Sequence, residues 1–212
     1  MDGNGRWASR RSLPRTAGHT EGEENLATVV RLAVKRDIGW LTVFGFSTEN
    51  WVRPRLEVRH ILGLHKKLFG RVAELNDLNV RVQWIGRPFG TQEARTPRYV
   101  QKAIIKAIAD TAGNTGMVLT VAFDYGSRAV IVHAAQRALA DDGTRIAAAD
   151  LDAHMYLPEL PPVDVVVRTS GERRISNFML WQSAGSPVFF TEQTWPDFGA
   201  VELDAAIAIA RR

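Results

Sequence analysis

The sequence predicts a three-layer α/β domain in which helices flank a mostly parallel central sheet. Short apolar runs rich in β-branched and aromatic residues alternate along the chain with longer segments of helical periodicity. The run at 40–46, WLTVFGF, is typical of a strand that is buried on both faces inside a parallel sheet, and so is the run at 163–167. The length of 212 residues, with 45% hydrophobic and 24% charged residues, fits one medium-sized globular domain.

In the first half of the chain, two helices and two strands are predicted. They are a helix at 21–36, a strand at 40–46, a helix from Pro54 to about Leu75 and a strand at 80–85. Pro54 suits the first turn of a helix, because its missing N–H would have no partner there. One face of that helix is apolar apart from His65, and its spacing is typical of a core face. That face comprises Val58, Ile61, Leu62, His65, Leu68, Phe69 and Val72.

The same alternation continues in the second half. The predicted elements are a helix at 96–110, strand 117–123, helix 129–140, a short helix at 147–154, strand 163–167, a short strand at 189–190 and a closing helix at 203–210. Prolines between residues 158 and 162 indicate a connector. Strands joined through helices are expected to run parallel in one sheet.

Residues 1–8, MDGNGRWA, and 15–19, RTAGH, carry the first candidate site. Two glycines let the backbone approach a bulky anion, and a carboxylate, an amide and a guanidinium lie beside them. Arg15 and His19 are four residues apart, so on a helix they share one face and can reach the same anion. This combination suits a diphosphate with its metal ion. Taken alone, the same residues also fit an ordinary turn with a solvated Arg6.

Two further polar blocks follow predicted strands. FSTENWVRPRLEV spans residues 46–58, VDVVVRTSGERRISNF spans 163–178, and WPDF follows at 195–198. In an open α/β sheet, the loops beyond the carboxyl ends of the strands form the ligand crevice. The polar residues expected there are Ser47, Glu49, Asn50 and Arg53. Taken alone, Ser47 and Thr48 could instead cap the next helix.

The charge pattern favours a small anionic ligand. The chain carries 27 Lys and Arg and a net charge of +4, which by itself could serve nucleic acid, an anionic membrane surface or a small anion. Several arginines lie inside the polar blocks, and no ladder of basic and aromatic residues suits a nucleic-acid strand. Without cysteine there is no disulfide, which is compatible with the reducing cytoplasm where we expect the protein. No run of 18 apolar residues predicts a transmembrane helix.

With these blocks in one order over nearly all 212 residues, the chain resembles the cis-prenyltransferases, or Z-isoprenyl diphosphate synthases, of which undecaprenyl diphosphate synthase is the best known. The resemblance implies the fold of that enzyme, with a hydrophobic tunnel walled by the Pro54–Leu75 helix; Leu64, Leu68 and Phe69 are candidates for the tunnel floor. It implies a prenyltransferase that condenses an allylic prenyl diphosphate with a C5 prenyl diphosphate and releases diphosphate. It also implies Mg²⁺ as cofactor, a homodimer and at most peripheral membrane contact.

The resemblance implies roles for individual residues. Asp2 would bind the metal and act with Asn50 in catalysis. The allylic diphosphate would be held by Gly3, Asn4, Gly5, Arg6, Arg15 and His19. The second diphosphate would be held by Arg168, Arg174 and Ser176, and the mobile substrate loop would include Ser47, Trp51 and Arg53. Taken alone, Arg168 and Arg174 could form surface salt bridges with Glu172 or with a partner chain.

Three positions depart from the family's usual pattern. Pro187 stands where the family has a second acidic residue near the metal, and Gly185 replaces an aromatic residue. Since proline cannot ligate a cation, Mg²⁺ would be held by Asp2, diphosphate oxygens and water. Asp124 stands where the family usually has Asn and is expected to bring a carboxylate to the rim of the site. These changes indicate a specialised member that makes a short product.

Residues 1–212 are predicted to form a single domain that lacks two segments of the family. A hydrophobic strand inside the sheet usually precedes the DGNGRW motif, and an Arg- and Gly-containing tail usually helps complete the neighbouring subunit's site. Either the numbering starts late on a longer natural chain or the sheet has lost a strand. The first is favoured, because an exposed central sheet edge promotes aggregation.

Three alternative functions stay open. A head-to-middle (lavandulyl-type) synthase would make a branched prenyl diphosphate. A non-catalytic subunit would bind prenyl diphosphates without turnover, although the presence of Asp2, Asn50, Arg168, Arg174 and Ser176 counts against it. A nucleic-acid-binding α/β protein would show affinity that falls steeply with salt. The product length and the natural substrate pair do not follow from the sequence.

Overall fold

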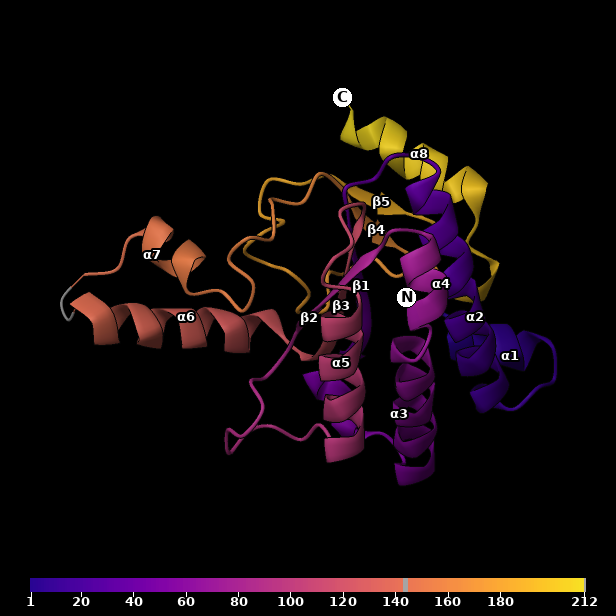
Figure 1. Ribbon diagram of the computed structural model, residues 1–212. Helices are drawn as coiled ribbons and strands as arrows, with labels where there is room; N and C mark the ends of the chain where they lie inside the picture. Colours follow the sequence, from indigo (N-terminus) through magenta and orange to yellow (C-terminus); the bar gives the residue numbers. More distant parts are fainter. Residues whose placement is uncertain (143–144, 212) are drawn as a thin grey trace.

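The structure is a computed structural model that describes residues 1–142 and 145–211 (Figure 1). Helices and strands alternate over these residues, as the sequence predicts. The first half comprises α1 (Asn4–Arg10), α2 (Arg15–Val34), β1 (Trp40–Ser47), the 3-10 helix η1 (Thr48–Val52), α3 (Arg55–Phe69), α4 (Val72–Asp77) and β2 (Arg81–Ile85). The second half comprises α5 (Arg98–Asp110), β3 (Val118–Tyr125), α6 (Ser127–Asp142), α7 (Ala148–Ala153), β4 (Val166–Arg168), β5 (Val188–Phe190), the 3-10 helix η2 (Trp195–Asp197) and α8 (Ala200–Ala210).

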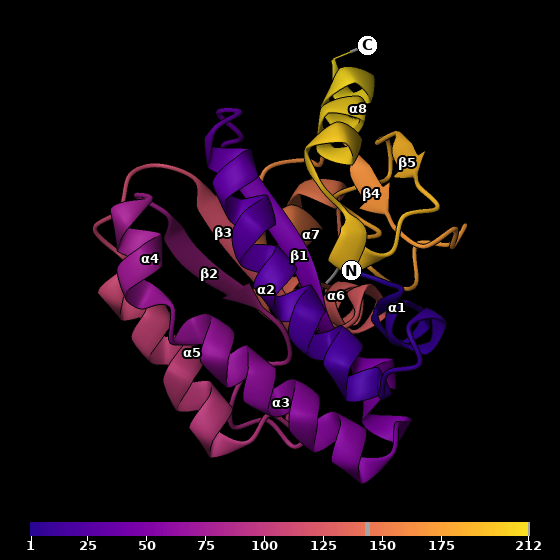
Figure 2. The ribbon, with the colours of Figure 1, turned by 90° about the vertical axis from the view of Figure 1, so that its right-hand side faces the viewer.

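All strand pairs among the described residues are parallel. β3 lies between β1 and β2 in the larger sheet and is buried along its whole length. β4 and β5 pair only with each other among the described residues. Figure 2 shows this pair and α8 beyond the β1 edge of the larger sheet. The predicted parallel α/β architecture is therefore confirmed, with the strands divided between two sheets.

Apolar side chains cover both faces of the larger sheet. On one face, α2, α3 and α5 pack through residues such as Leu26, Ile61 and Ile104 against β3. On the other face, Val130 and Ala134 of α6 join a second cluster with Tyr125. The sheet is thus the middle of three layers, as predicted.

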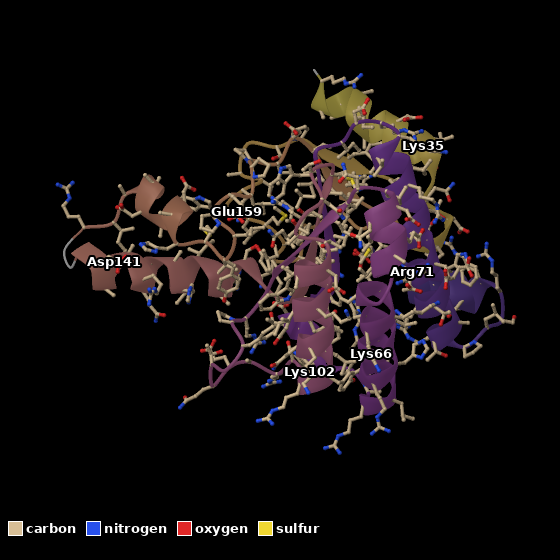
Figure 3. The ribbon with its side chains drawn as sticks, viewed as in Figure 1. Lys35, Lys66, Arg71, Lys102, Asp141 and Glu159 are labelled. Atoms are coloured by element: carbon tan, nitrogen blue, oxygen red, sulfur yellow. The ribbon has the colours of Figure 1, made fainter. Side chains whose placement is uncertain are left out.

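The predicted helix from Pro54 to Leu75 is wrong in its last third, where the chain breaks. α3 ends at Phe69, Gly70 is its C-cap, and Arg71 leaves the helical region with ψ of 28°. Arg71, labelled in Figure 3, binds Glu23 with Nε at 2.9 Å and Glu24 with Nη2 at 2.6 Å. These ion pairs across to α2 favour the break over a continuous helix.

Other predicted elements differ in extent. β4 (Val166–Arg168) overlaps only the last two residues of the strand expected at 163–167, because the ladder exists only where β5 lies alongside. β1 is only partly buried, whereas the sequence predicted burial on both faces, since its residues from Trp40 to Gly45 line a cavity. The helix α1 was not predicted; it begins after Gly3, whose φ of +99° favours glycine.

β1 ends in a bulge that prepares the site. Gly45 has no partner in the β1–β3 register, which shifts between Phe44 and Phe46. A Cβ on Gly45 would lie 2.3 Å from Nε2 of His65, so only glycine fits beside this ring. Bulges bend a strand and re-aim the residues that follow, here Ser47 and the segment after it.

We predict that Gly18→Ala strongly destabilises the protein. A Cβ at Gly18 would lie 1.9 Å from the backbone oxygen of Asn4, so α1 and α2 would have to separate. The expected loss is about 3 kcal/mol in the free energy of unfolding, measured by urea denaturation. Gly63→Ala is the control, because no atom lies within 4 Å of its Cβ position, and it is expected to gain roughly 0.5–1 kcal/mol. Equal stability of the two variants would contradict the prediction.

Candidate functional site

One cavity of about 1240 Å³ brings the predicted site residues together. It opens among the start of α1, the first turns of α2, the segment from β1 to α3 and the loop after β4. All predicted site residues except Trp51 line it: Asp2, Gly3, Asn4, Gly5, Arg6, Arg15, His19, Ser47, Asn50, Arg53, Arg168, Arg174 and Ser176. Segments far apart in the sequence therefore share one polar cavity wall.

Asp2 and Arg168 form an ion pair in this wall. Nη2 of Arg168 lies 3.0 Å from Oδ2 of Asp2 and donates a 3.0 Å hydrogen bond to Oγ of Ser176. The Arg168 side chain is 11% exposed, and its Nε is buried without a partner in the described part of the chain. The backbone of Asp2 is fixed by Thr169 and by the N–H of Trp195, which donates to its carbonyl oxygen at 2.8 Å. The Asp2 carboxylate remains 40% exposed toward the cavity.

Glu172 joins two further predicted arginines. Its Oε1 lies 3.0 Å from Nη2 of Arg6, and its Oε2 lies 3.3 Å from Nη2 of Arg174. Arg6 and Arg174 are otherwise largely exposed. The salt bridge that the sequence offered as an alternative for Arg174 is thus present, and it brings the two guanidinium groups to one carboxylate.

Glu57 contacts His19, Arg53 and Arg15 with one carboxylate oxygen. The sequence analysis did not identify Glu57 as a site residue. Its Oε1 lies 3.2 Å from Nε2 of His19, 3.1 Å from Nη1 of Arg53 and 3.5 Å from Nη2 of Arg15. Burial raises its pKa, but the hydrogen bond to His19 and the charges of Arg15 and Arg53 outweigh burial, so the pKa lies below its usual value. Burial lowers the pKa of His19, and Glu57 only partly opposes this. The available signal was a carboxylate three residues after Pro54, in the first turn of a helix.

The two glycines of the first motif permit close approach. A Cβ on Gly5 would lie 2.8 Å from Nη1 of Arg15, so the guanidinium rests directly on the backbone there. A Cβ on Gly3 would lie 2.6 Å from Oγ of Ser170. Beside them, Oδ1 of Asn4 is buried with no hydrogen-bond partner among the described residues, and Asn4 lines the cavity. An unpaired buried acceptor of this kind carries a desolvation cost until it finds a ligand.

The segment from Ser47 to Arg53 follows the bulge as a capped 3-10 turn. Oγ of Ser47 accepts from the N–H of Glu49 at 3.0 Å, and Oδ1 of Asn50 accepts from the N–H of Ser47 at 3.1 Å. The capping role offered as an alternative for Ser47 is therefore observed, and Ser47 lines the cavity as well.

Asn177 ties this segment to the block after β4, and it too was missed. Its Nδ2 donates to Oε1 of Glu49 at 2.9 Å. Its own carbonyl and Oδ1 accept from the N–H groups of Ser127 and Arg128, each at 2.9 Å. Asn177 and Ser176 both have positive φ, of 59° and 54°. Left-handed backbone in non-glycine residues costs free energy and often occurs at functional sites.

Trp51 and Asp124 lie behind the cavity wall. Nε1 of Trp51 donates to Oδ1 of Asp124 at 2.7 Å, and the Trp51 ring packs edge-on against Phe46. Asp124 is completely buried and does not line the cavity, so the expectation that it lies at the rim is wrong. Trp51, Arg87, Arg95 and Thr96 surround its carboxylate, which has no contact with solvent.

Beyond the polar wall the cavity lining is mostly apolar, although Arg36, Asp37, Asp164 and Arg211 also line the cavity. Leu64 and Leu68 line it as expected for floor residues, whereas Phe69 is buried in the core and does not. His65 also lines it; Nδ1 donates to the carbonyl oxygen of Ile61 at 2.9 Å, which leaves Nε2 as an acceptor facing Gly45. Burial lowers the pKa of His65 to about 4, so the ring is neutral at neutral pH.

The departures at 185 and 187 fall outside the cavity lining. Pro187 is exposed just before β5, and its carbonyl accepts from the N–H of Val166 at 3.0 Å. Gly185 is exposed as well. No group of three or more acidic or histidine side chains in the described ranges is arranged to hold a metal ion. Within residues 1–142 and 145–211, the helices are too short or too polar to cross a membrane.

Comparison with known sequences gives concordant results. The family described as putative undecaprenyl diphosphate synthase matches residues 1–210. An isoprenyl transferase of Neisseria gonorrhoeae is 43% identical over 209 residues, which are 98% of this chain and 82% of the relative. An isoprenyl transferase of Brucella abortus is 44% identical over 219 residues, covering all of this chain and 84% of the relative.

Two solved structures share the fold. Lavandulyl diphosphate synthase from Lavandula x intermedia, in complex with dimethylallyl diphosphate, superposes with a TM-score of 0.91 at 31% identity, over 100% of this chain and 92% of that one. A probable undecaprenyl diphosphate synthase from Campylobacter jejuni superposes with a TM-score of 0.79 at 26% identity, over 91% of this chain and 89% of that one.

We predict that His65 makes the protein less stable in acid. The folded protein protonates His65 only near pH 4, whereas the unfolded chain does so near 6.5. Between these values the unfolded state binds more protons, so the free energy of unfolding falls as the pH drops from 6.5 to 4, by about 3 kcal/mol. His65→Leu should flatten this slope in urea denaturation series, while the effect of His19, whose pKa is lowered in the same direction, persists. An unchanged slope in the variant would refute the assignment.

Proposed function

The chain belongs to the family of the putative undecaprenyl diphosphate synthases, the cis-prenyltransferases, and on that premise we propose that it joins an allylic prenyl diphosphate to a C5 prenyl diphosphate. In this reaction a carbon–carbon bond forms, the bond from carbon to diphosphate breaks, and a proton is lost. The observation that carries the proposal is one cavity with guanidinium groups at one end and apolar side chains at the other. The guanidinium groups can stabilise the negative charge of the leaving diphosphate, and the apolar side chains can hold the prenyl chain away from water.

We assign the allylic diphosphate to the wall formed by Gly3, Asn4, Gly5, Arg6, Arg15 and His19. Arg15 rests on Gly5, so a phosphate there can meet a guanidinium and backbone N–H groups together. Glu57 and Glu172 hold Arg15 and Arg6 in place before the anion binds. A diphosphate competes well for such arginines because its charge exceeds that of one carboxylate.

The second diphosphate is assigned to Arg168, Arg174 and Ser176. Arg168 is directed by Asp2 and Ser176, and its unpartnered Nε offers a further donor. Arg174 is 72% exposed and is free to swing from Glu172 to an incoming anion. Two diphosphate positions that meet at Glu172, which pairs with Arg6 of the first and Arg174 of the second, would place the two prenyl units side by side.

Asp2 is the proposed metal ligand. Its carboxylate is exposed to the cavity, and within the described ranges it does not belong to a group of three or more acidic or histidine side chains that could hold a metal ion. This donor set fits Mg²⁺, which is commonly held by one or two carboxylates together with substrate phosphates and water. When bound, Mg²⁺ would neutralise charge on the leaving diphosphate.

Asn50 and the substrate segment complete the proposed site. The Asn50 side-chain oxygen is engaged by the N–H of Ser47, which leaves the amide nitrogen as a donor at the cavity wall. We propose that this amide orients the reacting C5 unit, while Arg53 closes the wall beside Glu57. Holding both partners in reacting geometry supplies much of the rate gain in such reactions.

We propose a short or specialised product. The α3 helix runs along the cavity from Glu57 at the charged end to Leu68. At a rise of 1.5 Å per residue, His65 lies about 12 Å beyond Glu57 along this helix. Its polar edge interrupts the apolar wall there, which disfavours a longer prenyl chain.

A second candidate is a head-to-middle synthase that makes a branched prenyl diphosphate. The similarity of the whole chain to lavandulyl diphosphate synthase favours it. The proline at 187 and the glycine at 185, in place of the residues usual in the family, are compatible with such a change. Both reactions would use the same two diphosphate positions.

We also propose that the protein acts as a cytoplasmic homodimer. The α6 and α7 helices extend away from the other layers (Figure 1), and Val132 and Leu139 of α6 are exposed apolar residues that a second copy could cover. Absence of cysteine is compatible with a reducing compartment.

The first test is product analysis. The purified protein is incubated with dimethylallyl, geranyl or farnesyl diphosphate, with and without isopentenyl diphosphate and Mg²⁺, and the dephosphorylated products are identified by mass spectrometry and NMR. We expect a linear Z-alcohol only when isopentenyl diphosphate is present, and loss of turnover by more than a hundredfold in Asp2→Ala. A branched product from allylic donors alone would favour the second candidate. No product from any pair, with Mg²⁺ present, would refute the proposal.

The second test concerns product length. His65→Leu should lengthen the mean product by at least one C5 unit, because the wall becomes apolar throughout. Leu64→Phe, which adds bulk to the same wall, should shorten it. The measurement is the chain-length distribution at limiting allylic diphosphate. If His65→Leu leaves the distribution unchanged, the wall at His65 does not set product length.

A further inference from the structure

Asp124 is a buried carboxylate that the proposed reaction does not use. It lies next to the carboxyl end of β3, has no solvent exposure and takes no part in the cavity lining. Its φ of 53° puts the backbone in the left-handed region, which Asp tolerates better than most residues. Burying a carboxylate is costly unless charges and hydrogen bonds compensate. The neighbours of Asp124 must therefore compensate the cost of its burial.

Four donors from two other segments meet the two oxygens of Asp124. Oδ1 accepts from Nε1 of Trp51 at 2.7 Å and pairs with Nη2 of Arg87 at 3.3 Å. Oδ2 accepts from the N–H of Arg95 at 3.3 Å and from Oγ1 of Thr96 at 3.4 Å. A carboxylate has about four lone-pair sites, so this set fills it.

An amide at this position could not replace the carboxylate. One side of an Asn side chain is an NH₂ group, which would face either the Trp51 and Arg87 donors or the Arg95 and Thr96 donors. An NH₂ group that faces other donors leaves at least one buried donor without an acceptor. The neutral amide also leaves Arg87 without a counter-charge.

Trp51 is the link from this cluster to the cavity. It belongs to η1, whose neighbours Ser47, Asn50 and Arg53 line the cavity. In the described part of the chain, the only other side-chain hydrogen bond between η1 and a distant segment runs from Nδ2 of Asn177 to Oε1 of Glu49, at 2.9 Å. Both bonds end on a carboxylate oxygen. The bond to Asp124 is the shorter, at 2.7 Å, and is partly buried, whereas the bond to Glu49 is exposed, so the bond to Asp124 should be the stronger of the two.

We propose that Asp124 is a positioning residue that holds the Ser47–Arg53 segment in its observed place, as a latch, through Trp51, with Arg87 as the counter-ion. The significance for catalysis rests on the function proposed above, because Asn50 and Arg53 lie on this segment. The latch itself requires no substrate. A segment released from the latch spends less time in the binding-competent position, so apparent affinity falls by that fraction.

Hydrogen–deuterium exchange of the ligand-free protein tests the latch. In Asp124→Asn, exchange of the amides in residues 47–53 should become roughly tenfold faster, because the bond from Trp51 is either lost or reduced to a weaker bond to a neutral amide oxygen. Trp51→Phe should have a similar effect, and the double variant should add nothing further. With substrates, the KM for the C5 diphosphate should rise by about the same factor, with a smaller change in kcat.

Asp152→Asn is the matched control. Asp152 likewise accepts from an indole, that of Trp181 at 2.6 Å, but it lies on α7 and does not line the cavity. It should leave exchange in residues 47–53 unchanged. If Asp124→Asn fails to fold, Trp51→Phe alone decides by the same readout.

Unchanged exchange in 47–53, or additive effects of the two substitutions, would overturn the latch. Because exchange is measured without substrate, the latch and the proposed reaction can fail separately. A protein with no turnover but with coupled effects at Asp124 and Trp51 would keep the latch and lose the reaction. A protein that turns over substrate but shows independent effects of the Asp124 and Trp51 substitutions would keep the proposed reaction and lose the latch.

Discussion

Electrostatic repulsion among guanidinium groups is the constraint on which the rest of the site depends. Arginines from α1, α2, the segment before α3, β4 and the loop after it all line one cavity. At short range in a partly buried site, like charges repel by several kcal/mol. Each of these arginines is paired with Asp2, Glu57 or Glu172. These carboxylates let the cations gather before any anion is present.

Those pairings demand particular backbone positions. Glu57 meets its partners because α3 begins next to the first turns of α2, and Asp2 meets Arg168 because its backbone is pinned by Thr169 and Trp195. The loop after β4 reaches its position through left-handed residues such as Ser170 and Ser176. Backbone strain is therefore found where the charged side chains converge. Its free-energy cost is offset by the packing of the three layers.

The two ends of the cavity follow from different parts of the same elements. The helix α3 contributes Glu57 to the charged end and Leu68 to the apolar end, and β1 lines the apolar region before its bulge leads to Ser47. A single bend in one strand and a single helix therefore separate charge from hydrocarbon. A prenyl diphosphate has the same division along its length.

The sequence by itself determined the order of helices and strands, the parallel α/β class and most of the motif residues that line the polar part of the cavity. These follow from local periodicity and from motifs in which neighbours along the chain act together, as in residues 2–6. Tertiary structure alone decided the partners. Arg6 meets Glu172 across 166 positions, and His19 meets Glu57 across 38. It also broke the helix at Gly70, through ion pairs of Arg71, and buried Asp124 beneath Trp51. Periodicity reports which face of an element is apolar, but it carries no information on which distant side chain that face or its ends will meet.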